Sequence, residues 1–112
     1  MIHEMKLNNQ PFETIKKGNK KIEMRLCDEK RSSILIGDEI EFSHRETGEK
    51  LRTRVVNLTK FNNFEELYEH FDKSVLGYEE NQIANPCDMS QYYSQKDVEK
   101  FGTLAIEIEI IK

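Results

Sequence analysis

Three charged side chains, Lys20, Glu23 and Arg25, lie within six residues of one another and could form a binding or catalytic site. Arg25 could grip a phosphate or a base edge with its planar fork of donors, and Lys20 could add a point charge. Glu23 could accept a hydrogen bond from an exocyclic amine or position a water molecule. Neighbouring cations should lower the pKa of Glu23 and make it a weaker base. The pattern therefore favours ligand binding over hydrolysis.

Residues 20–26 alternate between apolar and charged side chains, which predicts a strand with one buried face and one charged face. The apolar residues on the face expected to be buried are Ile22, Met24 and Leu26. Alternation places Lys21 beside Glu23 and Arg25, and places Lys20 on the opposite face. Either Lys20 precedes the strand, where alternation does not apply, or Lys21 is the partner of Glu23. The alternative without a function is an exposed salt-bridge patch of Lys21, Glu23 and Arg25, which would add little stability.

Further candidates for ligand contact lie elsewhere in the chain. Tyr92 and Tyr93 could stack on a base, an interaction worth roughly 1–3 kcal/mol, or they could simply fill the mouth of a barrel. Ser43 could donate a hydrogen bond if its strand lines the cleft. Lys6 and Arg31 could contact phosphate.

The elements that would hold these residues alternate between short strands and short helices. In the helix expected at 10–17, Pro11 suits the first turn, and Gly18 can end the helix in a left-handed conformation. Asn63 is expected to cap a helix that begins at Phe64. The remaining expected segments are strands at 2–7, 20–26, 51–58 and 103–111, a strand after a turn at 37–38, a loop at 27–33, a hairpin turn at 46–49, an irregular stretch at 77–95 and a helical turn near 96–101. Five or so strands with two or three helices make an α+β domain with antiparallel or mixed pairing.

The size and composition of the chain predict one domain over residues 1–112. No apolar run approaches the roughly 20 residues that span a bilayer, and the start of the chain lacks a secretion signal, so we expect a cytoplasmic protein without membrane contact. Cys27 and Cys87 are expected to be free thiols. The histidines and cysteines show no metal-ligand spacing, so we expect neither a metal nor a cofactor.

The charge is unevenly distributed along the chain. The net charge of −4 argues against a protein that coats nucleic acid nonspecifically. Residues 14–31, however, contain seven Lys and Arg against three Asp and Glu, a local balance of +4. One basic segment on an acidic body suits a confined anionic ligand better than a long duplex. A charge run that is merely solvated is the alternative.

Residues 18–25, Gly-Asn-Lys-Lys-Ile-Glu-Met-Arg, resemble the G-x-K-x-x-E-x-R signature of ASCH domains. Other segments resemble the family in the same order along the chain: HEMKL, PFETIKKG, IGDEIEF, FEELY and MSQYYSQKDVEKFGTLAIEI. The resemblance implies a small PUA-like β-barrel of about five or six strands with two to three flanking helices. It also implies a cleft for RNA or a nucleotide near the signature. One branch of the family removes the acetyl group of N4-acetylcytidine with a lysine, a threonine nucleophile and a glutamate. Lys20 matches that lysine, but Glu23 stands where the threonine would be.

Three functions follow as hypotheses. The first is an RNA- or nucleotide-binding module built around Lys20, Glu23 and Arg25. The second is a hydrolase acting on a modified nucleoside or on RNA, in which Glu23 activates water and Lys20 stabilises the oxyanion. The third is an adaptor that binds proteins through its acidic face. The sequence leaves open whether the protein is a monomer or a weak dimer paired through an edge strand.

Overall fold

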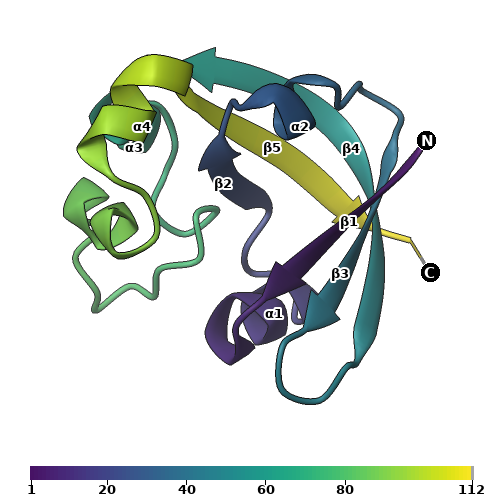
Figure 1. Cartoon of the computed structure of the whole chain (residues 1–112). Coiled ribbons are helices and arrows are strands. Elements are labelled where there is room, and N and C mark those ends of the chain that lie inside the picture. The colour runs from purple at the N-terminus through teal and green to yellow at the C-terminus, as the bar shows by residue number, and fades with distance from the viewer. Residues whose placement is uncertain (112) are drawn as a thin grey trace.

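The structure, a computed structural model, describes residues 1–111 and is built on one five-stranded sheet (Figure 1). The strands are β1 (Ile2–Leu7), β2 (Ile22–Leu26), β3 (Glu39–His44), β4 (Lys50–Phe61) and β5 (Thr103–Ile110). The helices are α1 (Asn9–Lys16), α2 (Glu29–Ser32), α3 (Phe64–His70) and α4 (Gln95–Phe101), with a 3₁₀ helix, η1 (Pro86–Gln91). The expected α+β fold is confirmed.

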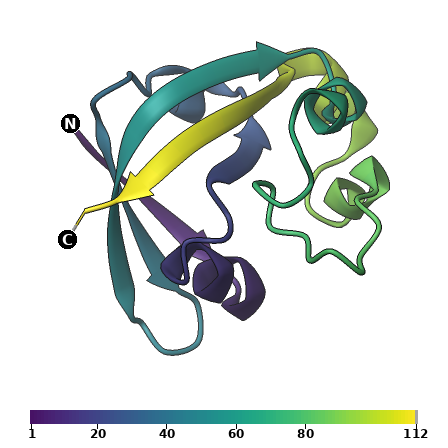
Figure 2. The ribbon, with the colours of Figure 1, turned by 180° about the vertical axis from the view of Figure 1, so that it is seen from behind.

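The sheet is mixed and curls into a half-barrel. Its order is β1-β3-β4-β5-β2, with β1 parallel to β3 and every other neighbouring pair antiparallel. Strand β4 is 12 residues long and pairs with both β3 and β5, and Figure 2 shows it arching beside β5. A register shift between Val55 and Asn57 lies in this pairing, and such irregularities bend strands. The curl leaves β1 and β2 as the two edges of the sheet.

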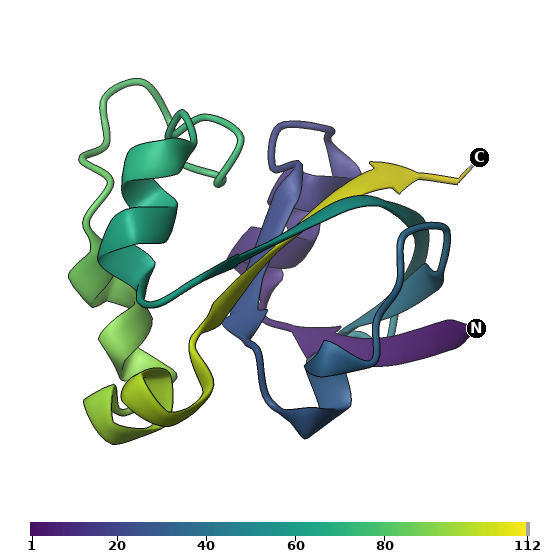
Figure 3. The same cartoon turned by 90° about the horizontal axis from the view of Figure 1, so that it is seen from above.

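Two hydrophobic clusters fix the elements around this sheet. Phe12 and Ile15 of α1 pack inside the curl in one cluster, together with Ile40 and Phe42 of β3. The second cluster joins β2 to α3, η1 and the loop after α3; its buried members are Ile22, Met24, Phe64, Leu67, Leu76, Met89 and Ala105. Figure 3 shows α3 and α4 gathered on one side of the curled sheet. The irregular part of the chain is therefore held against β2.

Most expected elements are present, and their caps follow the expected chemistry. Asn63 accepts a hydrogen bond from the backbone of Glu66 at the start of α3, and Gly18 follows α1 with φ +85°. The loop expected at 27–33 instead contains the single turn of α2, because Asp28 accepts a hydrogen bond from the Arg31 amide. Strand β4 extends three residues beyond the expected end at residue 58. Within residues 1–111, no helix combines the length and apolarity that a membrane crossing requires.

Candidate functional site

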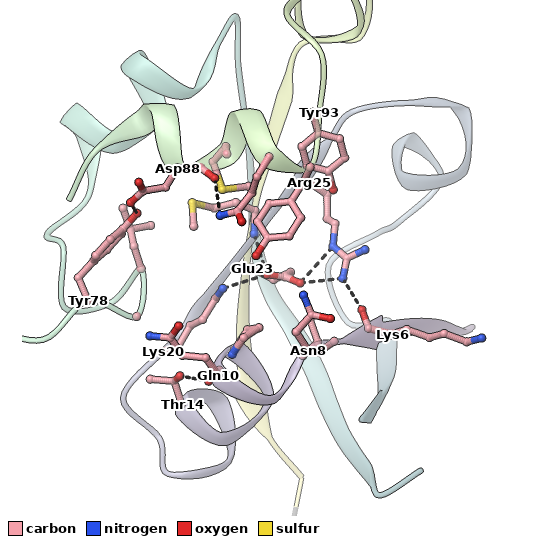
Figure 4. Close-up of a pocket in the computed structure, with 18 of the residues that line it drawn as sticks. Lys6, Asn8, Gln10, Thr14, Lys20, Glu23, Arg25, Tyr78, Asp88 and Tyr93 are labelled. Carbon is pink, nitrogen blue, oxygen red and sulfur yellow. Dashed lines mark hydrogen bonds and ion pairs between the residues drawn. The ribbon is translucent and has the colours of Figure 1, made fainter. Parts of the chain in front are cut away.

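A pocket of about 500 Å³ opens between the two edge strands of the sheet and the segment that follows β4 (Figure 4). Strands β1 and β2 contribute Lys6 and Arg25 on one side, with α1 beside them. The edges are not paired in the sheet, but Arg25 Nη2 donates to the Lys6 carbonyl over 3.2 Å. A side chain thus bridges the open seam of the half-barrel at the pocket.

The Glu23 carboxylate is buried in this pocket and engages both of its oxygens. Its Oε1 accepts from the Met24 amide and lies 3.1 Å from Lys20 Nζ. Its Oε2 accepts from Arg25 Nε at 3.1 Å and from Nη2 at 2.8 Å. Burial opposes ionisation, but Lys20 and Arg25 outweigh it and lower the pKa of Glu23 to about 2. The carboxylate is therefore a fixed anion between two cations.

Lys20 reaches Glu23 because it precedes β2, which begins at Ile22. After α1 the chain makes a Schellman turn, in which the Gly18 amide donates to Ile15 and the Asn19 amide to Thr14. The Lys20 amide also donates to the Thr14 carbonyl, which fixes the start of its side chain. Alternation along the strand therefore does not apply to Lys20. Of the two lysines that the sequence left open, Lys20 and not Lys21 is the partner of Glu23.

Gly77 also positions Lys20, from the opposite side of the pocket. Its φ is +102°, and a Cβ there would come within 3.0 Å of Lys20 Cδ. Glycine suits this position for two reasons. It adopts the positive φ without strain, and its lack of a side chain leaves room for the aliphatic part of Lys20 to pack against it. Lys21, in contrast, is exposed and lines a neighbouring groove rather than this pocket.

One face of β2 is charged, as the alternation predicts, but it is not exposed to solvent as the salt-bridge alternative requires. Glu23 is 4% exposed and Lys20 9%. The reason is that both faces of the strand are covered: the second cluster covers Ile22 and Met24, and the pocket walls surround Glu23 and Arg25. An exposed salt-bridge patch of Lys21, Glu23 and Arg25 is not what the chain forms.

The pocket has two walls of different chemistry. The wall from residues 6–45, which we name the cationic wall, carries five cations and one carboxylate, a net charge of +4. These charged residues are Lys6, Lys20, Glu23, Arg25, Arg31 and Arg45. The wall from residues 68–93, which we name the tyrosine wall, carries four tyrosines and one carboxylate. These residues are Tyr68, Tyr78, Asp88, Tyr92 and Tyr93.

Tyr92 and Tyr93, the two tyrosines expected to contact a ligand, differ in how tightly their rings are packed. Tyr93 stacks on Phe64, with ring centroids 5.9 Å apart and an 18° angle between the planes. Burial raises the pKa of Tyr93. Tyr92 is 53% exposed at the rim, with its ring centroid 6.5 Å from that of Tyr93. Tyr93 is thus held by packing, whereas Tyr92 presents a ring to solvent.

The structure brings most of the candidate residues together. The ones that line the pocket are Lys6, Lys20, Glu23, Arg25, Arg31, Tyr92 and Tyr93. Lys21 and Ser43 lie outside this lining; Ser43 sits on β3 between its pairing partners Lys6 and Lys50.

The sequence reasoning missed three lining residues that form a hydrogen-bonded chain: Tyr68, Tyr78 and Asp88. Tyr68 shares the helical spacing of Phe64, Leu67 and Phe71, which is typical of residues that face a core, and Tyr78 and Asp88 lie in the stretch without periodicity. Asn85-Pro86, a turn signal just before Asp88, marks the start of the 3₁₀ helix that carries Asp88.

Comparisons with known proteins agree on one family. The ASCH domain model matches residues 5–112, and ASCH domains are generally RNA-binding. The crystal structure of hypothetical protein PH0355 is similar with a TM-score of 0.84 and 35% identity, covering 99% of this chain and 100% of that one. The solution NMR structure of protein PF0455 from Pyrococcus furiosus has a TM-score of 0.72 and 35% identity, covering 100% and 99%. No curated protein matches this sequence. The chain belongs to the ASCH domain family.

Proposed function

We propose that this protein is an RNA- or nucleotide-binding module whose ligand occupies the pocket between the cationic wall and the tyrosine wall. The observation that carries the proposal is the opposition of these walls, a net charge of +4 facing four tyrosines. Phosphate needs cations and hydrogen-bond donors, and a base needs a flat surface on which to stack. A nucleotide combines both requirements in one molecule.

The individual side chains suit this ligand. Arg25 is held in place by Glu23, so its guanidinium is fixed before any ligand arrives. Lys6, Arg31 and Arg45 extend the positive charge along the same wall. Tyr92 offers an exposed ring for stacking. The volume of about 500 Å³ lies within the range of roughly 300–1,000 Å³ that is typical of small-molecule sites.

The state of Glu23 supports binding over hydrolysis. A general base works best when its pKa lies near the working pH, whereas that of Glu23 is lowered to about 2. Both of its oxygens are already occupied by donors from Lys20, Met24 and Arg25. We therefore give Glu23 the role of positioning the two cations.

We place the protein in the cytoplasm, since both cysteines are free, as in a reducing compartment.

Calorimetric titration with nucleosides, nucleotides and short single-stranded RNAs tests the proposal. We expect saturable binding by the natural protein that is lost or much weakened in Glu23→Gln and Arg25→Ala. Lys21→Ala is the matched control, because this lysine adjoins the cluster but lies outside the pocket lining, so it should bind as the natural protein does. Absence of binding to every member of the panel would overturn the proposal.

A further inference from the structure

Three side chains of the tyrosine wall form a hydrogen-bonded chain that the proposed function does not yet use. The Tyr78 hydroxyl donates to Asp88 Oδ2 over 2.7 Å, and the hydroxyls of Tyr68 and Tyr78 are 2.8 Å apart. A hydroxyl has one proton to donate. Because Tyr78 gives its proton to Asp88, its oxygen accepts the proton of Tyr68. The chain therefore runs in one direction, from Tyr68 through Tyr78 to Asp88.

This direction makes the end of the chain an acceptor. Burial, together with the hydrogen bond that Tyr78 donates to Asp88, raises the pKa of Tyr78 far above its usual value, so Tyr78 keeps the proton that it donates. Among residues 1–111, the hydrogen bonds and ion pairs of the structure leave Asp88 Oδ1 without a side-chain or backbone donor. An ionised carboxylate has only acceptor sites to offer. A ligand group that meets Asp88 must therefore donate a hydrogen bond.

The acceptor lies across the pocket from the cations. Figure 4 shows Tyr78 and Asp88 on one side, Arg25 and Lys6 on the other, and Glu23 between them. A ligand that satisfies both sides has an anionic group at one end and a hydrogen-bond donor at the other. In a nucleotide the anionic group is the phosphate, and the donor that distinguishes cytosine and adenine from their keto counterparts is the exocyclic amine. Uracil and hypoxanthine carry a carbonyl oxygen where the amine would be, and that oxygen would face the carboxylate.

We infer that Asp88, held by Tyr78 and Tyr68, is a specificity residue that selects nucleotides whose base carries an exocyclic amine over their keto counterparts. This inference rests on the proposed function and adds the ligand class to it. Asp88 itself is exposed, so water competes for the carboxylate and limits the preference. Hydrogen bonds to charged groups nevertheless discriminate, and we expect a preference of about five- to tenfold.

The test is a comparison of dissociation constants within two matched ligand pairs. The ligands are cytidine against uridine and adenosine against inosine, each as the 5′-mononucleotide and as the 5′-phosphorylated trinucleotide. The natural protein should bind the amino member of each pair about five- to tenfold more tightly. In Asp88→Asn the ratio should fall to near one, because an amide both donates and accepts. In Tyr78→Phe the ratio should fall as well, since Asp88 loses the donor that orients it.

Two control variants, Glu80→Gln and Lys6→Ala, separate recognition of the base from a general effect of charge on phosphate binding. Asp88→Asn also removes a negative charge, which should strengthen the binding of every phosphate. Glu80→Gln removes an exposed carboxylate that lines the neighbouring groove, and it should change all affinities while leaving the ratios unchanged. Lys6→Ala should weaken all ligands alike. Asp88→Asn changes an exposed side chain, and its circular dichroism and melting temperature would establish that it folds.

The outcomes distinguish this inference from the proposed function. Binding with equal affinity within each pair, or a preference that survives in Asp88→Asn, would overturn the inference and leave the proposed function standing. An equal loss of affinity for both members of a pair in Asp88→Asn would also overturn it, because Asp88 would then meet a ribose hydroxyl. If no ligand bound, the proposed function would fail and the inference with it.

Discussion

Glu23 is a buried carboxylate whose charge is balanced by two cations. This balance determines how the stability of the protein responds to mutation of these residues and to pH. Lys20 Nζ lies 3.1 Å from one oxygen and Arg25 Nη2 lies 2.8 Å from the other. Breaking a buried pair by removing one partner typically costs about 3–5 kcal/mol, because the remaining charges are left unpaired. Loss of Glu23 would leave two unpaired cations, so the residue supports the fold as well as the site.

The first prediction concerns acid stability. The pKa of Glu23 is lowered from 4.5 to about 2 in the folded protein. Its contribution to stability, on the order of 3 kcal/mol, is therefore present above about pH 4.5 and is lost as the pH falls toward 2. Urea unfolding measured between pH 2 and 7 should show this loss in the natural protein and a flatter profile in Glu23→Gln. Identical pH profiles for the two proteins would show that Glu23 is not stabilised as an anion.

At the scale of elements, the connections before and after β2 set the geometry of the site. The Schellman turn after α1 brings Lys20 to Glu23, and the loop that contains Gly77 covers the stem of Lys20. Neither segment is part of a helix or strand, yet together they determine that Lys20, and not Lys21, enters the pocket. The Lys21 and Ile22 amides both donate to the Val75 carbonyl, which ties this loop to the start of β2.

The second prediction compares two glycines with similar backbones. Gly77 and Gly48 have φ values of +102° and +76°, so an alanine at either position should cost roughly 1 kcal/mol of stability. Only at Gly77 would the added Cβ meet Lys20; at Gly48 there is nothing within 4 Å. Gly77→Ala should therefore weaken nucleotide binding in calorimetry, whereas Gly48→Ala should not. Equal binding by both variants would argue against a role for Lys20 in the site.

The sequence predicted the helices and strands better than it predicted which segments pack against them. Alternation in residues 20–26 identified the strand and its apolar face, but it carries no information about what covers the opposite face. The choice between Lys20 and Lys21 depended on where the strand begins, and hydrogen bonds to Thr14 and Val75 determine that point. The tyrosine wall was missed in part, because residues 77–95 lack a period and are ordered by side-chain contacts such as that of Tyr78 with Asp88.

At the scale of the molecule, the half-barrel has an open seam between β1 and β2 that Arg25 bridges. Its guanidinium bonds Glu23 on its own strand and the Lys6 carbonyl on the other edge. The fork geometry of arginine allows both contacts at once, whereas the single ammonium of a lysine on a flexible stem does not reproduce it. The same side chain thus belongs to the ligand pocket and to the closure of the sheet.

The third prediction follows from this double role. Arg25→Lys keeps the charge but should lose the bridge, so β1 and β2 should open more often. Hydrogen exchange monitored by NMR should become faster at the amides of these edge strands and remain nearly unchanged in the pairing of β4 with β5. Uniform acceleration across the sheet would indicate global destabilisation, and no change would mean that the bridge to Lys6 does not hold the seam.

The last prediction concerns the length of nucleic acid that the protein can hold. The cationic wall carries +4 and the whole chain −4, so the residues outside this wall sum to a net charge of −8. A strand that leaves the pocket meets a body that is acidic overall, which should repel further phosphates. Binding of single-stranded RNA should therefore stop improving beyond about three nucleotides, with about two phosphates neutralised and a slope of log K against log salt near −1.4. Affinities measured for strands of one to twelve nucleotides at several salt concentrations test this. A slope that steepens steadily with length would instead indicate an extended basic track, and the confined pocket would then be only one part of the binding surface.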